Sequence, residues 1–153
     1  MARELVHGTC VAFGPTAVLL RGESGAGKSD LAFRFLALPP QGEARPMLVA
    51  DDQVLVTVAA DGALIASPPP ALAGKIELRG IGIVEVPFLG HAELRLVCDL
   101  VDQKDVPRMA PEPWESAGIA GIALPALKLA PFEASAPLKL KTALFLATGV
   151  NPK

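Results

Sequence analysis

A glycine-rich segment near the start of the chain has residue types and a spacing that could bind phosphate. It matches the pattern G-x-x-x-x-G-K-[S/T] at every specified position, and a chance match in a chain this long is on the order of one in a hundred or less. The segment consists of Gly22, Glu23, Ser24, Gly25, Ala26, Gly27, Lys28 and Ser29. Its glycines allow successive backbone N–H groups to turn toward one anion. The segment therefore predicts a site for the phosphates of a nucleotide, most simply ATP.

The last two residues of this segment could act directly on the nucleotide. Lys28 would add a positive charge at the terminal phosphates, and Ser29 would place its hydroxyl on Mg²⁺. The alternative is a glycine-rich turn in which Ser29 only caps the following helix. An apolar strand precedes the segment and a helix follows it, which is the order that a phosphate-binding loop requires. This context favours nucleotide binding.

Two adjacent aspartates could supply the other half of a phosphoryl-transfer site. Asp51 and Asp52 follow a short apolar strand expected over residues 47–50. Neighbouring strand residues point to opposite faces, so only one of the two should face the nucleotide. That carboxylate could orient or deprotonate an acceptor, or, as in nucleotide hydrolases, hold Mg²⁺ through water. Two exposed aspartates of a turn are the remaining alternative.

The elements that must position these residues are separated by clear turn signals. Apolar and β-branched runs predict strands over residues 4–13, 17–21, 47–50, 54–59, 63–66, 83–88 and 92–100. Helical spacing predicts a helix over 30–38, and a helix is favoured over a strand for 138–146. Residues 101–115 are charged and rich in proline, which is typical of a mobile loop. The sequence thus predicts one α/β domain with a long, hairpin-rich sheet.

Composition limits the classes of partner and the cellular compartment. The 153 residues are 51% hydrophobic and carry a formal net charge of −2, so the basic surface that nucleic-acid binding needs is not expected. The first residues fit neither a signal peptide nor a membrane span, and we expect a cytoplasmic protein with no membrane partner. Cys10 and Cys98 lie in apolar runs, where a free thiol behaves as a small buried hydrophobe.

Two further segments are ambiguous when their residues are taken alone. Residues 75–83 read K-I-E-L-R-G-I-G-I, with Glu77 and Arg79 two positions apart and glycines that allow close backbone approach. An edge strand with an exposed pair of charges explains this pattern as well as a functional site does. His7, next to Gly8, is likewise more often a histidine at a strand end than a catalytic one.

Taken in order, these segments resemble the catalytic domain of HPr kinase/phosphorylase. The order is His7-Gly8, the glycine-rich loop, the strand that ends at Asp51-Asp52, and the E-L-R-G-I-G-I sequence from Glu77, which is close to diagnostic for the family. The resemblance is good over residues 4–90 and loose beyond them. It implies a P-loop-containing mixed α/β sheet with hairpins, similar to the HPr kinase and PEP carboxykinase catalytic domains. It also implies that residues 1–153 form a single catalytic domain without the N-terminal domain of full-length members.

The resemblance implies ATP- and Mg²⁺-dependent phosphorylation of a serine on the phosphocarrier HPr, and in many members the reverse phosphorolysis. Carried over, Asp52 would take the serine proton, Lys28 would bind the transferred phosphoryl group, and Ser29 and Glu77 would approach Mg²⁺. His7 would lie beside the acceptor. Arg108 is the best match to a family arginine that follows the signature.

Some features depart from the family or leave other functions open. A family Gly-Arg segment corresponds roughly to residues 130–136, where no Gly-Arg occurs, so the reverse reaction has less support. Family members are typically hexamers, which implies a homo-oligomer. A small-metabolite kinase is one alternative, but it would usually need an arginine-rich lid, and residues 101–115 offer only Arg108. A non-catalytic ATP sensor is another, although a sensor would not need the base Asp52.

Overall fold

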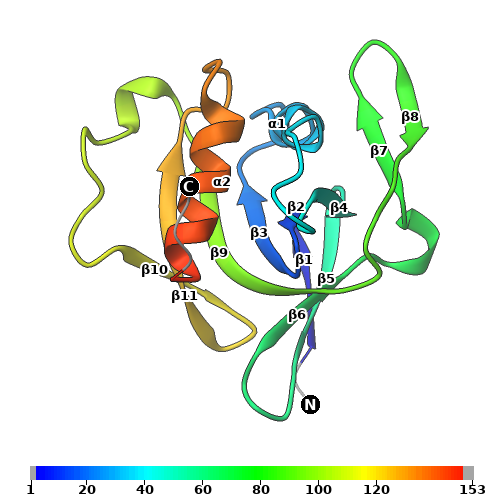
Figure 1. The fold of residues 1–153 in the computed structure, drawn as a ribbon, viewed down its shortest axis with the longest axis horizontal. Helices are drawn as coiled ribbons and strands as arrows, with labels where there is room; N and C mark the ends of the chain where they lie inside the picture. Colours follow the sequence, from blue (N-terminus) through cyan, green and yellow to red (C-terminus); the bar gives the residue numbers. More distant parts are fainter. Residues whose placement is uncertain (1–2, 150–153) are drawn as a thin grey trace.

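The chain forms a strongly curved mixed sheet with two helices packed on one face (Figure 1). The computed structural model describes residues 3–149. The main sheet has the order β1-β5-β6-β9-β3-β2-β4, with β11 beside β9 and β10 beside β11. Its strands are β1 (Arg3–His7), β2 (Thr9–Phe13), β3 (Thr16–Arg21), β4 (Pro46–Ala50), β5 (Gln53–Val58), β6 (Leu64–Ser67), β9 (Ala92–Leu100), β10 (Glu115–Ile119) and β11 (Ile122–Leu129).

The remaining elements are two helices, two short turns of 3₁₀-helix and a separate hairpin. Helix α1 spans Lys28–Leu36 and α2 spans Ala136–Ala147, while η1 covers Pro70–Leu72 and η2 covers Gln103–Asp105. Strands β7 (Lys75–Leu78) and β8 (Gly82–Glu85) form a two-stranded sheet of their own, which stands apart from the main sheet at the right of Figure 1. None of the helices in residues 3–149 is long and apolar enough to cross a membrane.

Strands β3, β4, β9 and β11 of the main sheet run in the same direction. Strand β9 is parallel to both β3 and β11, and β4 shares the direction of β3 because each pairs antiparallel with β2. Their last residues are Ala50, Arg21, Leu100 and Leu129. The carboxyl ends of β4, β3, β9 and β11 therefore meet at one edge of the sheet, called here the carboxyl edge. In open α/β sheets this is where ligands bind.

Both faces of the central strands are covered, which explains their almost continuous apolar sequences. On one face the helices pack on β2, β3 and β9, and Phe13 contacts the rings of Phe35 and Phe145 edge-on at centroid distances of 6.2 and 5.4 Å. On the other face, residues such as Leu19 and Val97 pack against side chains from β5, β6, β10 and β11. The central strands are thereby fixed from both sides, and the loops at the carboxyl edge start from a rigid base.

Most of the elements expected from the sequence are confirmed, with three differences. The single strand expected over residues 4–13 is divided at Gly8, where a Cβ atom would lie 2.7 Å from the carbonyl oxygen of Leu20. As a result β1 pairs with β5, while β2 pairs with β3 and β4. The strand expected over 83–88 is the shorter β8. Strands β10 and β11 were not predicted, because glycine, alanine and Pro125 weaken the strand signal.

A candidate phosphoryl-transfer site

The glycine-rich loop lies between β3 and α1, as the sequence predicts. Strand β3 ends at Arg21 and α1 begins at Lys28. Gly27 immediately precedes the helix with a φ of 97°, a left-handed conformation that a residue with a side chain rarely adopts. The free N–H groups and positive dipole end of α1 are thus next to the loop, which suits a phosphate.

Lys28 is buried and holds the loop together. Its Nζ donates hydrogen bonds to the carbonyl oxygens of Gly22 at 2.8 Å and Glu23 at 2.9 Å. An ammonium group has three N–H donors, so one remains for a ligand beyond these two bonds. The contacts hold a positive charge against the backbone of the loop, where it can attract a phosphate.

Asp51 is the centre of a buried hydrogen-bond network next to this loop. It directly follows β4 and only 7% of its surface is exposed. Its Oδ1 accepts hydrogen bonds from the hydroxyls of Thr9 at 2.9 Å and Ser29 at 2.7 Å, and its Oδ2 accepts one from the backbone N–H of Glu77 at 3.1 Å. The carboxylate therefore connects β2, α1 and β7, and it lies beside the hydroxyl that was expected to bind Mg²⁺.

The side chain of Asp52 lies outside this network and is exposed to solvent. Its φ of 72° is left-handed, a conformation that Asp tolerates better than most residues and that turns its side chain away from the buried network. The exposed carboxylate has its Oδ1 3.7 Å from Nδ1 of His7, and the carbonyl oxygen of Asp52 accepts a hydrogen bond from Gly8 N–H at 3.0 Å. Asp52 and His7 thus form an exposed pair adjoining the buried network.

The structure brings together most of the residues predicted to form a site. Ser29 and the backbone of Glu77 are bound to Asp51, although the side chain of Glu77 is exposed. Asp52, next in the chain, is paired with His7, and Lys28 directly precedes Ser29 in α1. Residues 101–114 lie away from this group, at the left edge of the molecule in Figure 1, across from β7 and β8. Arg108 lies in this loop, is exposed, and has its Nη1 3.9 Å from Sδ of Met109.

Sequence reasoning did not find Thr9 and left the role of Asp51 open. Thr9 is fully buried in a strand whose other residues are apolar. A buried hydroxyl needs a hydrogen-bond partner. The polar Thr9 in the otherwise apolar run TCVAF therefore indicates that such a partner lies nearby in the fold. Within residues 3–149, no group of three or more His, Cys, Asp or Glu side chains could hold a metal ion. A Mg²⁺ ion would therefore need phosphate oxygens as well, which is its usual mode of binding.

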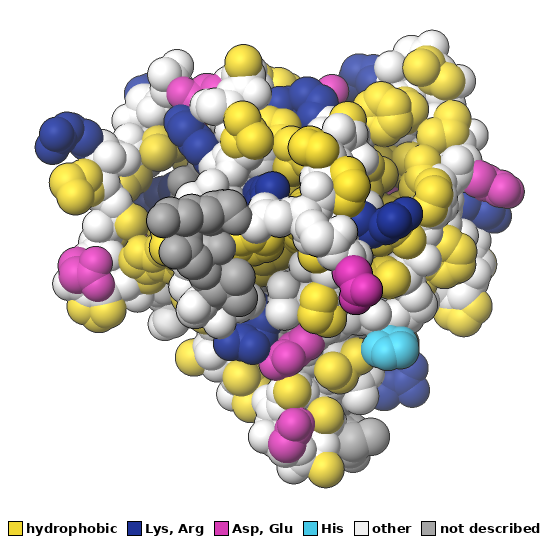
Figure 2. All heavy atoms as spheres, viewed as in Figure 1, with side chains coloured by type: hydrophobic (Ala, Val, Ile, Leu, Met, Phe, Trp, Pro, Cys, Tyr) yellow, Lys and Arg dark blue, Asp and Glu magenta, His cyan; other side chains and the backbone are white. Residues whose placement is uncertain are grey.

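The apolar side chains of the β7–β8 hairpin are unusually exposed. Ile81 is 75% and Ile83 68% exposed, and Phe88 follows the hairpin with a partly exposed ring. Figure 2 shows apolar side chains gathered over this side of the molecule. Because the N–H of Glu77 in β7 binds Asp51, this apolar surface adjoins the candidate site. Such a surface next to a polar site is typical of contact with another protein.

Comparison with known proteins identifies the family. Residues 1–108 match the family described as the HPr Serine kinase C-terminal domain. The HPr kinase/phosphorylase of Exiguobacterium sibiricum is 36% identical over 102 residues, covering 62% of this chain and 31% of that protein. The HPr kinase/phosphorylase of Clostridium tetani is 42% identical over 84 residues, covering 55% of this chain and 25% of that protein. The chain thus spans about a third or less of the length of these relatives.

A solved structure extends the similarity over nearly the whole chain. The HPr(Ser) kinase/phosphatase from Coxiella burnetii superimposes with a TM-score of 0.74 at 25% sequence identity, covering 91% of this chain and 87% of that one. The predicted fold class, a mixed α/β sheet of the HPr kinase type, is therefore confirmed. The match also includes residues beyond 108, where the resemblance in sequence is loose.

Proposed function

The chain belongs to the HPr serine kinase C-terminal domain family, and on that premise we propose that it is a single catalytic module that transfers the terminal phosphoryl group of ATP to a serine of an HPr-like phosphocarrier. The observation that supports this proposal is that two adjacent aspartates lie in different environments. Asp51 is buried and accepts a hydrogen bond from the hydroxyl of Ser29, whereas Asp52 is exposed and paired with His7. One carboxylate can serve the metal and the nucleotide, and the other can serve an acceptor from solvent.

The nucleotide phosphates would be bound by the backbone of the glycine-rich loop and by Lys28. The loop residues involved are Gly22, Glu23, Ser24, Gly25, Ala26, Gly27, Lys28 and Ser29. Lys28 already lies within hydrogen-bonding distance of two loop carbonyls, so its charge needs little reorganisation to meet a phosphate. A fixed positive charge at the transferred group stabilises the negative charge that develops in the transition state.

A Mg²⁺ ion fits the donors that the structure places beside the loop. Ser29 and Asp51 supply a hydroxyl and a carboxylate 2.7 Å apart, and oxygen donors of this kind, completed by phosphate oxygens, are what Mg²⁺ prefers. Glu77 is a further candidate, because its backbone is bound to Asp51. When bound, the ion would neutralise charge on the phosphates. Thr9 would keep the Asp51 carboxylate oriented toward Ser29.

Asp52 would act on the acceptor. Its exposed carboxylate would take the proton of the acceptor hydroxyl as that oxygen bonds to phosphorus and the bond to the leaving ADP breaks. His7, 3.7 Å away, would hold the carboxylate toward the acceptor side. In the reverse direction Asp52 would return the proton to the serine. Arg108 would reach the acceptor side only through a movement of residues 101–114, and in that case Arg108→Ala would lower the rate of transfer.

The exposed apolar hairpin favours a protein acceptor over a small metabolite. Ile81 and Ile83 lie on the element that also supplies a donor to Asp51, so an acceptor protein could bind them while presenting its serine to Asp52. A small metabolite would gain nothing from such a surface. The proposed homo-oligomeric state rests on family membership and is measurable by light scattering.

The direct test is to incubate the purified chain with Mg-ATP and HPr and to follow the mass of HPr. We expect a gain of one phosphoryl group, and no gain with HPr whose acceptor serine is replaced by alanine. Addition of phosphate to the product then tests the reverse reaction, which we expect to be weak. If HPr gains no mass while ATP binds, the chain is not an HPr kinase, and a metabolite kinase or an ATP sensor becomes the better interpretation.

A further inference from the structure

The glycine-rich loop has two different sides, and the proposed function uses only one of them. In the sheet, β4 lies on one side of β3, while β9 and β11 lie on the other. Asp51 and Ser29 belong to the first side, where the terminal phosphate would react. A nucleotide bound with its terminal phosphate there must extend its other end along the loop. The nucleoside end of the nucleotide would then lie near the loops that follow β9 and β11.

A cavity of about 840 Å³ lies on this second side. It is formed by the end of β3 and the glycine-rich loop (residues 21–26), by the end of β9 and the segment after it (residues 99–103 and 105), and by residues 130–133 after β11. Its volume is within the range of about 300–1,000 Å³ that is usual for small-molecule sites. Its walls come from the carboxyl ends of three neighbouring parallel strands, and it opens directly onto the loop that would hold the phosphates.

The charges in this cavity suit a neutral group with hydrogen-bond donors and do not suit a second anion. Arg21 contributes a guanidinium group, but it is paired with Asp99 through two hydrogen bonds of 2.8 and 3.1 Å. Glu23, Asp102, Asp105 and Glu133 add four carboxylates to the lining, of which Glu133 forms an ion pair with Lys139 at 2.8 Å. Carboxylates accept hydrogen bonds from ribose hydroxyls and from amino groups, whereas they repel phosphate. The lining therefore matches the nucleoside part of a nucleotide.

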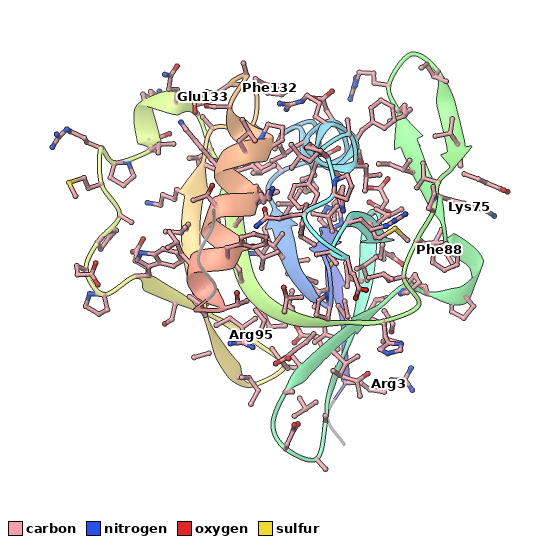
Figure 3. The ribbon with its side chains drawn as sticks, viewed as in Figure 1. Arg3, Lys75, Phe88, Arg95, Phe132 and Glu133 are labelled. Carbon is pink, nitrogen blue, oxygen red and sulfur yellow. The ribbon has the colours of Figure 1, made fainter. Side chains whose placement is uncertain are left out.

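Phe132 lines this cavity, and Figure 3 shows its side chain in the loop that precedes α2. It is 70% exposed, although its loop is firmly attached, because Arg34 of α1 donates hydrogen bonds to the carbonyl oxygens of both neighbours, Pro131 and Glu133. The ring lies against Gly27, where a Cβ atom would be 2.8 Å from its Cζ. A large apolar side chain that is fixed and yet exposed beside a phosphate loop is well placed to stack on a base.

We propose that this cavity binds the nucleoside of ATP, with the base stacked on Phe132 and the ribose toward the carboxylates of the lining. This inference rests on the proposed function, since it assumes that the loop holds the phosphates. The attachment of residues 131 and 133 to Arg34 keeps the ring in place before the nucleotide arrives, so little ordering is needed on binding.

Calorimetry with two ligands separates nucleoside binding from phosphate binding. Mg-ATP and Mg-tripolyphosphate share the triphosphate, but only ATP carries a nucleoside. The wild-type chain should bind ATP more tightly. Phe132→Ala should weaken ATP binding about 5- to 100-fold, as expected for loss of a base-stacking ring, and leave tripolyphosphate affinity unchanged. Phe132→Trp should retain ATP affinity. Phe33→Ala, at a 45% exposed phenylalanine of α1 outside the cavity, is the matched control.

Each remaining outcome has a distinct meaning. Equal affinities of the wild-type chain for ATP and tripolyphosphate overturn the nucleoside cavity and leave the phosphate loop intact. Equal losses for both ligands in Phe132→Ala also overturn it, because Phe132 then acts on the loop and not on the base. No binding of either ligand to the wild-type chain overturns the phosphate loop, and this inference with it. Failure to phosphorylate HPr, with the ligand difference present, overturns only the proposed kinase reaction.

Discussion

Replacement of Asp51 by alanine should destabilise the protein strongly, because this carboxylate accepts hydrogen bonds from three other segments. Asp51→Ala removes the acceptor of the Thr9 and Ser29 hydroxyls and of the Glu77 N–H. Thr9 is fully buried, so its hydroxyl has no access to water in the folded state. A buried donor left without a partner costs about 1–3 kcal/mol, and a lost hydrogen bond to a charged group about 1.5–3 kcal/mol. We expect a total loss of about 2–5 kcal/mol.

A double-mutant cycle with Thr9→Val isolates the hydrogen bond from general effects of the substitution. In the wild-type background, Thr9→Val removes one donor to Asp51 and should cost about 1–2 kcal/mol. In the Asp51→Ala background the hydroxyl is already without its acceptor, so Thr9→Val should be neutral or stabilising. The two substitutions should therefore be non-additive, with a coupling of about 1–2 kcal/mol.

Urea denaturation, followed by tryptophan fluorescence, measures all four corners of this cycle. The single tryptophan, Trp114, is partly buried and packs against the core that includes the helices, so its emission should report unfolding. Additive losses within about 0.3 kcal/mol would refute the reasoning, since contacting residues in one network are expected to couple. A loss below about 1 kcal/mol for Asp51→Ala would likewise show that the network contributes little to stability.

Three further predictions address the proposed reaction and the core. Asp52→Asn should lower the rate of phosphoryl transfer about 10²- to 10⁴-fold, as expected for loss of a general base, with unchanged ATP affinity by calorimetry, because Asn tolerates the left-handed backbone at this position. A transfer rate equal to that of the parent would show that another group is the base. Lys28→Ala should weaken ATP binding about 10- to 100-fold in the same assay, and unchanged affinity would contradict the phosphate-binding loop. Burial, and secondarily the Asp99 carboxylate, raises the pKa of the Cys98 thiol from 9.0 to about 12. Between these two values the folded chain holds a proton that the unfolded chain has lost, so the free energy of unfolding should fall as pH rises from 9.0 toward about 12 and be unaffected by this thiol below 9.0. Urea midpoints measured on both sides of pH 9.0 check this, and Cys98→Ala should reduce the dependence without abolishing it, because burial also raises the pKa of the Cys10 thiol above 9.0.

The parts of the fold that could be predicted are those with strong local signals. The glycine-rich loop between a strand and a helix, and the two strands expected over residues 54–59 and 63–66, which form the β5–β6 hairpin, depend on residues that are close in sequence. Strands β10 and β11 could not be predicted in this way. They are held by pairing with each other and with β9, and this tertiary pairing stabilises a segment that contains Pro125.

The candidate site shows the same limit for residues that are far apart in sequence. The spacing within residues 22–29 is enough to identify Lys28 and Ser29. The residue pattern alone left the roles of Asp51 and Asp52 open, and the family resemblance gave a role only to Asp52. The role of Asp51 depends on its contact with Thr9, 42 positions away. The nucleoside cavity was not foreseen for a related reason, since its walls come from three segments that only the sheet order brings together.

The left-handed backbone at Asp52 is what allows two adjacent aspartates to serve different partners. If β4 continued as a regular strand, Asp52 would point to the face opposite Asp51, where the apolar side chains of β5 and β6 pack. A carboxylate buried there without a partner would be costly. The φ of 72° avoids this by turning Asp52 into solvent beside His7. The conformation costs about 1–2 kcal/mol for a residue other than glycine, and such strain is characteristic of functional positions. The hydrogen bond from Gly8 N–H to the carbonyl of Asp52 offsets part of this cost and connects the turn to His7.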